Sequence, residues 1–244
     1  MTLFSADGWL FFMRWFHFLA GITWIGMLYY FNFVQTPFFA TPEATPVRVG
    51  MIAGSLVGRA LWWFRWGAML TFITGWIIIL HKIGQYGGVR GFLTQSYGWA
   101  ILTGGALGSI MWANVWFVIW PAQKVVIASA TQVAKGGAAI PEAAARGTRS
   151  GFASRTNTLF SIPMLFFMGA ASHLTLFAAG TRGAKIGMIV IGGIIVLLVE
   201  ANALFGAKGT TKTMLSKLST TLWAGFILTA ILWLLFVVLF PHVA

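Results

Sequence analysis

Two histidines lie within long apolar stretches, and each has a glycine on the same helical face. His17 stands in RWFHFLAG, four residues before Gly21, and His173 stands in MLFFMGAASHL, four residues after Gly169. Residues four apart are neighbours on the surface of an α-helix. An imidazole can ligate a metal through either ring nitrogen, and an ionisable group inside a membrane helix is a candidate functional residue. These four positions are therefore the first candidates for a binding site.

The elements that carry these residues have the composition of an integral membrane protein. Of the 244 residues, 59% are hydrophobic and 8% are charged, whereas soluble domains carry about 25% charged residues. There is no cysteine, which excludes disulfides, thiolate metal sites, iron–sulfur clusters and covalent c-type haem. The net charge of +12 comes from bases in short loops between apolar stretches, as membrane topology requires. We therefore expect a lipid bilayer and no nucleic acid as partner.

A membrane-spanning helix needs about 20 mostly apolar residues. Six stretches satisfy this rule, which predicts an all-α, polytopic helix bundle forming a single transmembrane domain over residues 1–244. The first stretch lacks a basic n-region and a cleavage site, so we expect a retained helix. The connection 122–154 is helix-prone on both sides of a break at KGGAAIP and should extend the flanking helices. The predicted spans are residues 9–35, 60–82, 98–120, 157–179, 185–206 and 215–240.

Six spans place both termini on one side of the membrane, and the basic residues indicate which side. Most Lys and Arg residues lie in the loops after the first, third and fifth predicted spans. By the positive-inside rule that side is cytoplasmic, so both termini are expected to be outside, in the periplasm. All four histidines then fall in the outer half, and His242, close to the C-terminus, is assigned no role.

This topology predicts that two histidines lie at matching depth. At about 1.5 Å per residue, His17 and His173 each lie roughly five residues outside the midpoint of their span, with Gly21 and Gly169 one turn deeper. A porphyrin between two helices needs axial imidazoles at one level and missing side chains beside them, so we expect a non-covalent haem b. His81 is a further candidate as iron ligand or propionate partner. Two alternatives remain, in which the glycines serve helix packing and the histidines bond neighbouring hydroxyl groups.

A second group of polar residues lies in the predicted inner half. Glu200 is the only acidic residue inside a predicted span, and a carboxylate there must be paired, with Arg65 or Arg155 as candidates, or protonated. The layer is either a structural set of cross-links or a substrate or proton site, because Arg and Asn together can bind a planar anion. Its members are Asn32, Gln35, Arg65, Asn114, Arg155, Asn157, Glu200 and Asn202.

Three stretches of the chain resemble the membrane domain of the bacterial membrane-bound urate oxidase (urate hydroxylase) family. They are WFHFLAGITWIGMLYYFNFVQTPFF, MWANVWFVIWPAQKVVI and SRTNTLFSIPMLFFMGAASH, and the resemblance covers most of residues 9–206. More distantly, the chain is similar to haem-binding membrane proteins of the protoporphyrinogen oxidase and copper-resistance D types. Those proteins likewise open with a first-helix histidine followed by a Trp-Gly-type pattern, here His17 and TWIG.

The resemblance implies a multi-pass protein of the bacterial inner membrane that oxidises urate or transfers electrons through haem b. Family members typically carry a fused cytochrome c domain, but this sequence has no C-x-x-C-H motif. Electrons are therefore expected to pass to a separate c-type cytochrome or to a respiratory or photosynthetic complex. A homo-oligomer is a further possible assembly. The alternatives are a haem-free structural or assembly subunit of such a complex and, less favoured, a small-solute transporter using Glu200. No catalytic residue is assigned.

Overall fold

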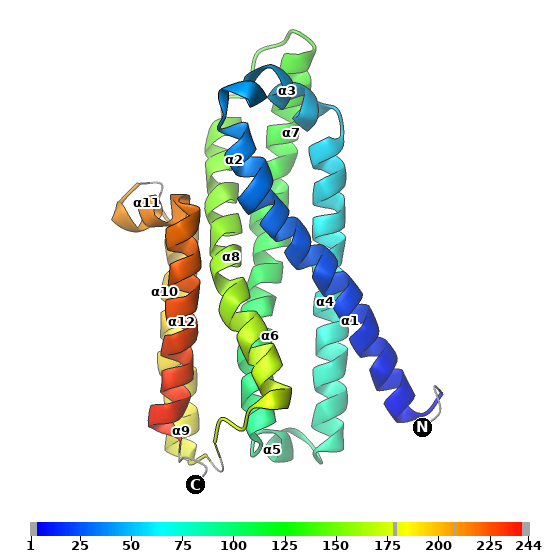
Figure 1. Ribbon diagram of the computed structural model, residues 1–244, viewed down its shortest axis with the longest axis vertical. Helices are drawn as coiled ribbons and strands as arrows, with labels where there is room; N and C mark the ends of the chain where they lie inside the picture. Colours follow the sequence, from blue (N-terminus) through cyan, green and yellow to red (C-terminus); the bar gives the residue numbers. More distant parts are fainter. Residues whose placement is uncertain (1–3, 178–179, 207, 241–244) are drawn as a thin grey trace.

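The structure is a computed structural model that describes residues 4–177, 180–206 and 208–240. Within these ranges every regular element is a helix, which confirms the all-α prediction. The long helices run side by side, and α1 (Ala6–Tyr29) begins at the end of the bundle at which α12 (Leu218–Leu239) finishes (Figure 1). His242 lies outside the described residues.

Five helical segments of the described chain are long and apolar enough to cross a membrane. They agree with five of the predicted spans, and the chain has the features of a multi-pass membrane protein. The segments are Ala6–Phe39 (α1, η1 of Tyr30–Gln35 and α2 of Thr36–Phe39), Leu56–Gln85 (α4), Ser96–Ala134 (α6 of Ser96–Ala113, η3 of Asn114–Ile119 and α7 of Trp120–Ala134), Arg182–Leu204 (α9 of Arg182–Gly187, η4 of Met188–Gly192 and α10 of Gly193–Leu204) and Leu218–Leu239 (α12).

The remaining predicted span, residues 157–179, differs from the structure in its bounds and in its polarity. It belongs to α8 (Ala143–His173), which begins earlier, ends earlier and is not one of the five apolar segments. The physical reason is that α8 contacts α6, α7, α10 and α12, so its polar side chains face protein. The prediction of six apolar spans is thus corrected to five, with one polar helix packed among them. Fully buried polar residues of α8 are Thr156, Asn157, Thr158 and Ser161.

Shorter helices complete the chain. The predicted break at KGGAAIP is confirmed, because α7 ends at Ala134 and α8 begins at Ala143. The helix α3, which packs on α4 and α7, was not predicted, because its nine residues are too few for a span. The short helices are η2 (Pro42–Ala44), α3 (Thr45–Ala53), α5 (Val89–Phe92) and α11 (Thr210–Ser216).

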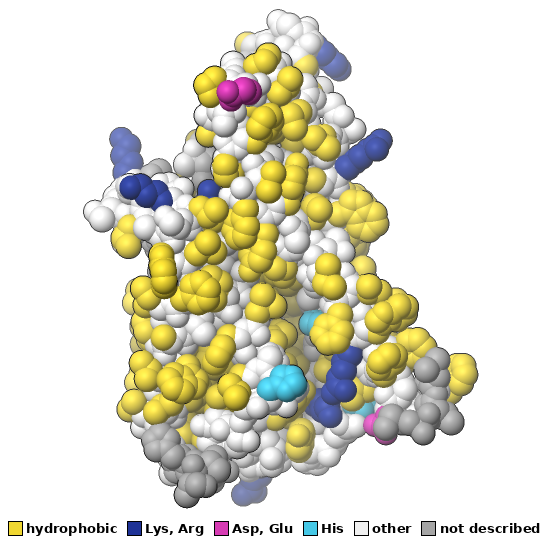
Figure 2. All heavy atoms as spheres, in the orientation of Figure 1, with side chains coloured by type: hydrophobic (Ala, Val, Ile, Leu, Met, Phe, Trp, Pro, Cys, Tyr) yellow, Lys and Arg dark blue, Asp and Glu magenta, His cyan; other side chains and the backbone are white. Residues whose placement is uncertain are grey.

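The outer surface of the bundle is rich in large apolar side chains, which Figure 2 shows over much of one face. Ile22, Phe117 and Val238 are 73%, 69% and 77% exposed. Apolar surface of this extent is unfavourable in water, whereas the hydrocarbon interior of a bilayer accommodates it. The surface therefore agrees with a lipid environment for the long helices.

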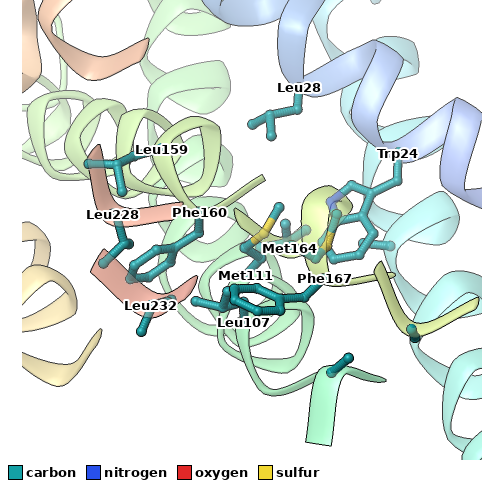
Figure 3. Packing of buried hydrophobic residues seen from close by; sticks show 14 of the residues in the cluster. Trp24, Leu28, Leu107, Met111, Leu159, Phe160, Met164, Phe167, Leu228 and Leu232 are labelled. Carbon is teal, nitrogen blue, oxygen red and sulfur yellow. The ribbon is translucent and has the colours of Figure 1, made fainter. Parts of the chain in front are cut away.

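The core lies where the long helices meet, and small residues allow close approach there. A Cβ atom on Gly67 of α4 would lie 3.0 Å from the backbone nitrogen of Trp24, and one on Gly104 of α6 would lie 3.1 Å from the Met164 carbonyl oxygen. Such a close approach of two backbones is typical of packed membrane helices. Figure 3 shows the buried side chains that fill the interior: Trp24, Leu28, Leu107, Met111, Leu159, Phe160, Met164, Phe167, Leu228 and Leu232.

Two π-helical turns interrupt long helices just before a proline. The Thr36 N–H bonds the Phe31 carbonyl oxygen at the end of η1, and the Trp120 N–H bonds that of Val115 at the end of η3, so each bond spans five residues instead of four. Pro37 and Pro121 follow directly; proline lacks an N–H, and its ring displaces the carbonyl one turn earlier. Such wide turns often mark functional sites.

Candidate functional site

His17 lies inside α1 and faces α4. Its Nδ1 is 3.1 Å from Thr74 Oγ1, and a Cβ atom on Gly75 would lie 3.0 Å from His17 Cε1, so the ring packs on bare backbone. The Thr74 hydroxyl donates its one proton to backbone carbonyls, the closer being Leu70 at 2.6 Å. The hydroxyl must therefore accept from His17 Nδ1–H, which leaves the lone pair of the neutral imidazole on Nε2. An imidazole oriented in this way can ligate iron.

Gly21 and Gly169 are not sites of close helix packing. A Cβ atom on Gly21 would meet Thr71 Cγ2 only at 3.9 Å, and one on Gly169 would meet nothing within 4 Å. Both positions thus differ from Gly67 and Gly104, where an added methyl group would press on backbone atoms. The packing explanation for these two glycines loses support, and each leaves space next to its helix.

His173 is the last residue of α8 and is exposed. The predicted equal depth of His17 and His173 stays a prediction, although the helix that carries His173 ends at this residue and does not continue to residue 179. His17 instead lies well inside its helix, Ala6–Tyr29. Figure 2 shows histidine side chains on both sides of a hollow in the lower half of the visible face, with Lys and Arg side chains beside them.

His81 lies four residues before the end of α4, in a cationic environment. Its Nε2 is buried and has no hydrogen-bond partner among the described residues. The adjacent Lys82 donates to Gln85 Oε1 at 2.8 Å, and its ammonium lies 5.9 Å from the Tyr97 ring centroid. Arg14 of α1 interacts electrostatically with both Lys82 and Tyr97. This end of the bundle therefore combines an unsatisfied imidazole nitrogen with two cations.

The polar layer predicted for the other half does not form one site. Three of its members form a closed network at the start of η3: Asn114 Nδ2 donates to Asn157 Oδ1 at 2.9 Å and to Glu200 Oε2 at 3.0 Å. Asn157 Nδ2 donates in turn to the Met111 carbonyl oxygen at 2.9 Å. Among the described residues, the hydrogen-bond partner of Glu200 is therefore an amide and not either of the two candidate arginines.

Arg65 and Asn202 lie apart from this network. The Arg65 guanidinium is 3.9 Å from the Trp120 ring centroid and 5.3 Å from that of Trp116, a cation–π arrangement. Asn202, at the end of α10, accepts from Thr211 Oγ1 at 2.7 Å, and its carbonyl oxygen accepts from Lys212 Nζ. Both residues thus hold local structure, and the structure brings neither of them to the other members of the layer.

Arg155 lines a cavity of about 490 Å³ at the α3 end of the bundle. The residue is only 9% exposed, and its Nη1 atom has no partner among the described residues. Two further members of the predicted layer, Asn32 and Gln35 of η1, line the same cavity. Asn32 Nδ2 donates to Ser154 Oγ at 2.8 Å, whereas Gln35 Oε1 is buried without a partner. Two residues of the π-helical turn η1 thus line the same cavity as Arg155.

Sequence reasoning missed other residues of this cavity. Gln123, whose Nε2 donates to Ser150 Oγ at 2.9 Å, lies in the connection 122–154, for which only an extension of the flanking helices was predicted. Arg48 lies in the unpredicted helix α3, and four phenylalanines lacked any signal that would separate them from core residues. The additional lining residues named here are Arg48, Gln123, Ser150, Phe31, Phe39, Phe64 and Phe152.

Comparison with known proteins decides the family. The model of the family described as urate oxidase N-terminal matches residues 92–236, which is more than half of the 244 residues. The chain belongs to the urate oxidase N-terminal family. This match confirms the proposed resemblance to the urate oxidase family, and it includes two of the three sequence stretches, since the first lies before residue 92. No curated protein and no solved structure matches the chain.

The match to the urate oxidase N-terminal family extends over α6 to α12 and includes both polar sites of α8. Asn114, Arg155, Asn157 and Glu200 all fall within it, whereas His17 lies before its first residue. The part of the chain that carries the closed network and the cavity arginine is thus the part that matches the family. The helices α1 and α4 supply the histidine site and the amides opposite Arg155.

Proposed function

We propose that this member of the urate oxidase N-terminal family is a membrane-embedded oxidoreductase module that holds haem b through His17. It takes electrons from a urate-type donor and passes them to a separate c-type cytochrome, in the bacterial inner membrane with both termini outside. The observation that carries the proposal is the hydrogen bond between His17 Nδ1–H and Thr74, which leaves the Nε2 lone pair available.

The residues around His17 fit a haem. His17 Nε2 would ligate the haem iron, and Thr74 fixes the ring orientation, as the outer-shell partner of a ligating histidine commonly does. His81, with its buried and unpartnered Nε2, and His173 are the candidates for a further ligand. Arg14 and Lys82 would neutralise the propionates near the membrane surface. Haem b, when bound, supplies a one-electron carrier.

A reduced-minus-oxidised spectrum of the purified protein tests the proposal. We expect a b-type α band in the wild type, its loss in His17→Ala, and its loss in one of His81→Ala and His173→Ala, which identifies the second ligand. Thr74→Val should keep the band but shift the reduction potential, because the imidazole loses its orienting partner. A colourless wild type that is folded by circular dichroism would overturn the proposal and favour the haem-free subunit.

Two controls sharpen this experiment. Gly169→Leu fills open space without touching the described protein, so loss of the band at unchanged thermal stability would place haem beside α8. Reduction of the band on addition of urate would separate an oxidising module from a simple electron carrier. A band that forms but does not respond to urate would contradict urate as the donor.

A further inference from the structure

The cavity beside Arg155 has a cationic lining and no acidic residue. It lies between η1, α3, α4, α7 and α8, and the described residues that line it include Arg155 and Arg48 but neither Asp nor Glu. Arg48, which is exposed, lies 5.8 Å from the Phe39 ring centroid. A buried guanidinium without a counter-charge is costly, so the cavity favours an anionic ligand.

The unpaired polar atoms of the cavity indicate which hydrogen-bonding groups the ligand carries, in addition to its charge. Arg155 Nη1 needs an acceptor, whereas Gln35 Oε1 needs a donor, and buried polar groups in proteins nearly always have partners. An inorganic anion that carries no proton, such as sulfate, would satisfy the arginine alone. A ligand that carries an N–H group beside an anionic oxygen would satisfy both residues.

The walls and the volume limit the shape of the ligand. Phe31 and Phe64 meet edge to face with ring centroids 5.6 Å apart, and Phe39 and Phe152 line other parts of the cavity. Flat aromatic walls favour a flat ligand. The volume of about 490 Å³ lies within the range of small-molecule sites, roughly 300–1,000 Å³, and it accommodates a fused two-ring heterocycle with water.

We propose that this cavity is a binding site for a planar heterocyclic monoanion, with Arg155 Nη1 donating to the anionic oxygen and Gln35 Oε1 accepting from a ring N–H. Asn32, held by its bond to Ser154, shapes the wall next to Gln35. The site is separate from His17, and only the choice of urate as probe rests on the proposed function.

Equilibrium dialysis with labelled urate, on the full chain in detergent micelles, tests the inference without any redox readout. Urate is a planar monoanion at neutral pH, and hypoxanthine is a neutral molecule of similar shape. We expect urate to bind at least about tenfold more tightly than hypoxanthine, since a hydrogen bond to a charged group contributes about 1.5–3 kcal/mol. Inorganic sulfate should not displace urate. Equal binding of hypoxanthine, or displacement by sulfate, overturns the proposal.

Variants assign the binding to these residues. Arg155→Met should weaken urate binding by on the order of 100-fold and Gln35→Leu by about tenfold. Arg65→Met is the matched control, because it removes the same charge from a residue outside the cavity, and binding should stay within about twofold. Unchanged binding in Arg155→Met, or an equal loss in Arg65→Met, would contradict the assignment.

Two further outcomes keep the inference separate from the haem proposal. Arg48→Gln changes an exposed residue and should fold normally. An approximately threefold loss of urate affinity in Arg48→Gln supports the site even if Arg155→Met does not fold. Unchanged affinity in Arg48→Gln counts against the site. A colourless wild type that still binds urate would overturn the haem proposal and leave this site in place. A protein with the b-type band that does not bind urate would do the reverse.

Discussion

Two polar sites lie two residues apart on α8, and they differ in how completely their groups are paired. Successive residues of an α-helix are rotated by about 100°, so Arg155 and Asn157 point to nearly opposite sides. Asn157 faces α6 and α10, where it forms a closed set of hydrogen bonds with Asn114 and the Met111 carbonyl oxygen. Arg155 faces the cavity and keeps an unpartnered Nη1.

The contrast separates polar groups that stabilise the fold from groups that await a ligand. In the Asn157 network the amide donors meet acceptors inside the protein, so the network cross-links three helical segments. Around Arg155 the structure pairs only part of the polar groups and leaves room next to the rest. Unpaired buried groups lower stability, and they persist where binding requires them. The comparison therefore predicts opposite effects of substitution at the two sites.

The largest effect on stability, a decrease, is expected for Asn157→Leu. The substitution leaves one N–H of the Asn114 amide without a partner in a buried position, although the amide keeps its bond to Glu200 Oε2. It also removes the side-chain donor to the Met111 carbonyl oxygen. The unpaired N–H should cost about 1–3 kcal/mol and the lost bond about 0.5–1.5 kcal/mol. The midpoint of thermal unfolding in micelles, followed by circular dichroism, should fall strongly. Asn202→Leu is the control, because Asn202 is only partly buried and should cost much less. An Asn157→Leu protein as stable as wild type would contradict the distinction.

The opposite effect on stability, an increase, is expected for Arg155→Met. Removing a buried guanidinium that lacks a full set of partners, while keeping most of the side-chain volume, should stabilise the unliganded protein by on the order of 1 kcal/mol. The same unfolding measurement checks this, without urate. If the variant unfolds at a lower temperature than wild type, the arginine contributes to the fold and the cavity is not held ready for a ligand.

A small effect is expected for Glu200→Gln. The Gln side-chain oxygen can still accept from Asn114 Nδ2, which is 3.0 Å from the carboxylate in the wild type, so stability should change by less than about 1 kcal/mol. Flux measurements in proteoliposomes test the transporter alternative with the same variant. Solute flux in the wild type that disappears in Glu200→Gln would show that the carboxyl group does more than close the network.

The smallest effect is expected for Tyr29→Phe. Because Ser161 donates to the Thr158 carbonyl oxygen at 2.7 Å, the Tyr29 hydroxyl donates to Ser161 Oγ at 2.9 Å. Losing this partly buried bond should cost about 0.5–1 kcal/mol, since Ser161 keeps its own acceptor. A cost as large as that of Asn157→Leu would mean that the closed network extends to α1.

Much of the fold follows from composition, because lipid requires long apolar helices and the sequence shows them directly. The helix that composition describes poorly is α8. Its Thr156, Asn157 and Thr158 are fully buried against other helices, and hydropathy cannot distinguish a polar side chain facing protein from one facing water. The predicted span also continued past His173, which is the last residue of α8.

The site was predictable in its residue types but not in its grouping. Arg155, Asn32 and Gln35 were recognised as polar residues in the inner half, and the structure brings them to one cavity. Asn114, Asn157 and Glu200 were placed in the same layer, yet they face the other side of α8. The missing information is the rotation of each helix about its own axis, which one sequence does not contain for helices that are apolar on most sides.

The wide turn η1 has a consequence for this rotation. It adds a residue between the part of the first helix that carries His17 and the part that continues into α2. One residue corresponds to about 100° of turn. Deleting one residue within η1 would restore regular winding and keep the two ends in phase, because the wide turn accommodates that extra residue. If all the residues of η1 were wound as a regular α-helix, the two ends would instead be rotated out of phase by this angle. His17 could then stay on Thr74, or Gln35 could stay in the cavity, but one rigid helix could not serve both.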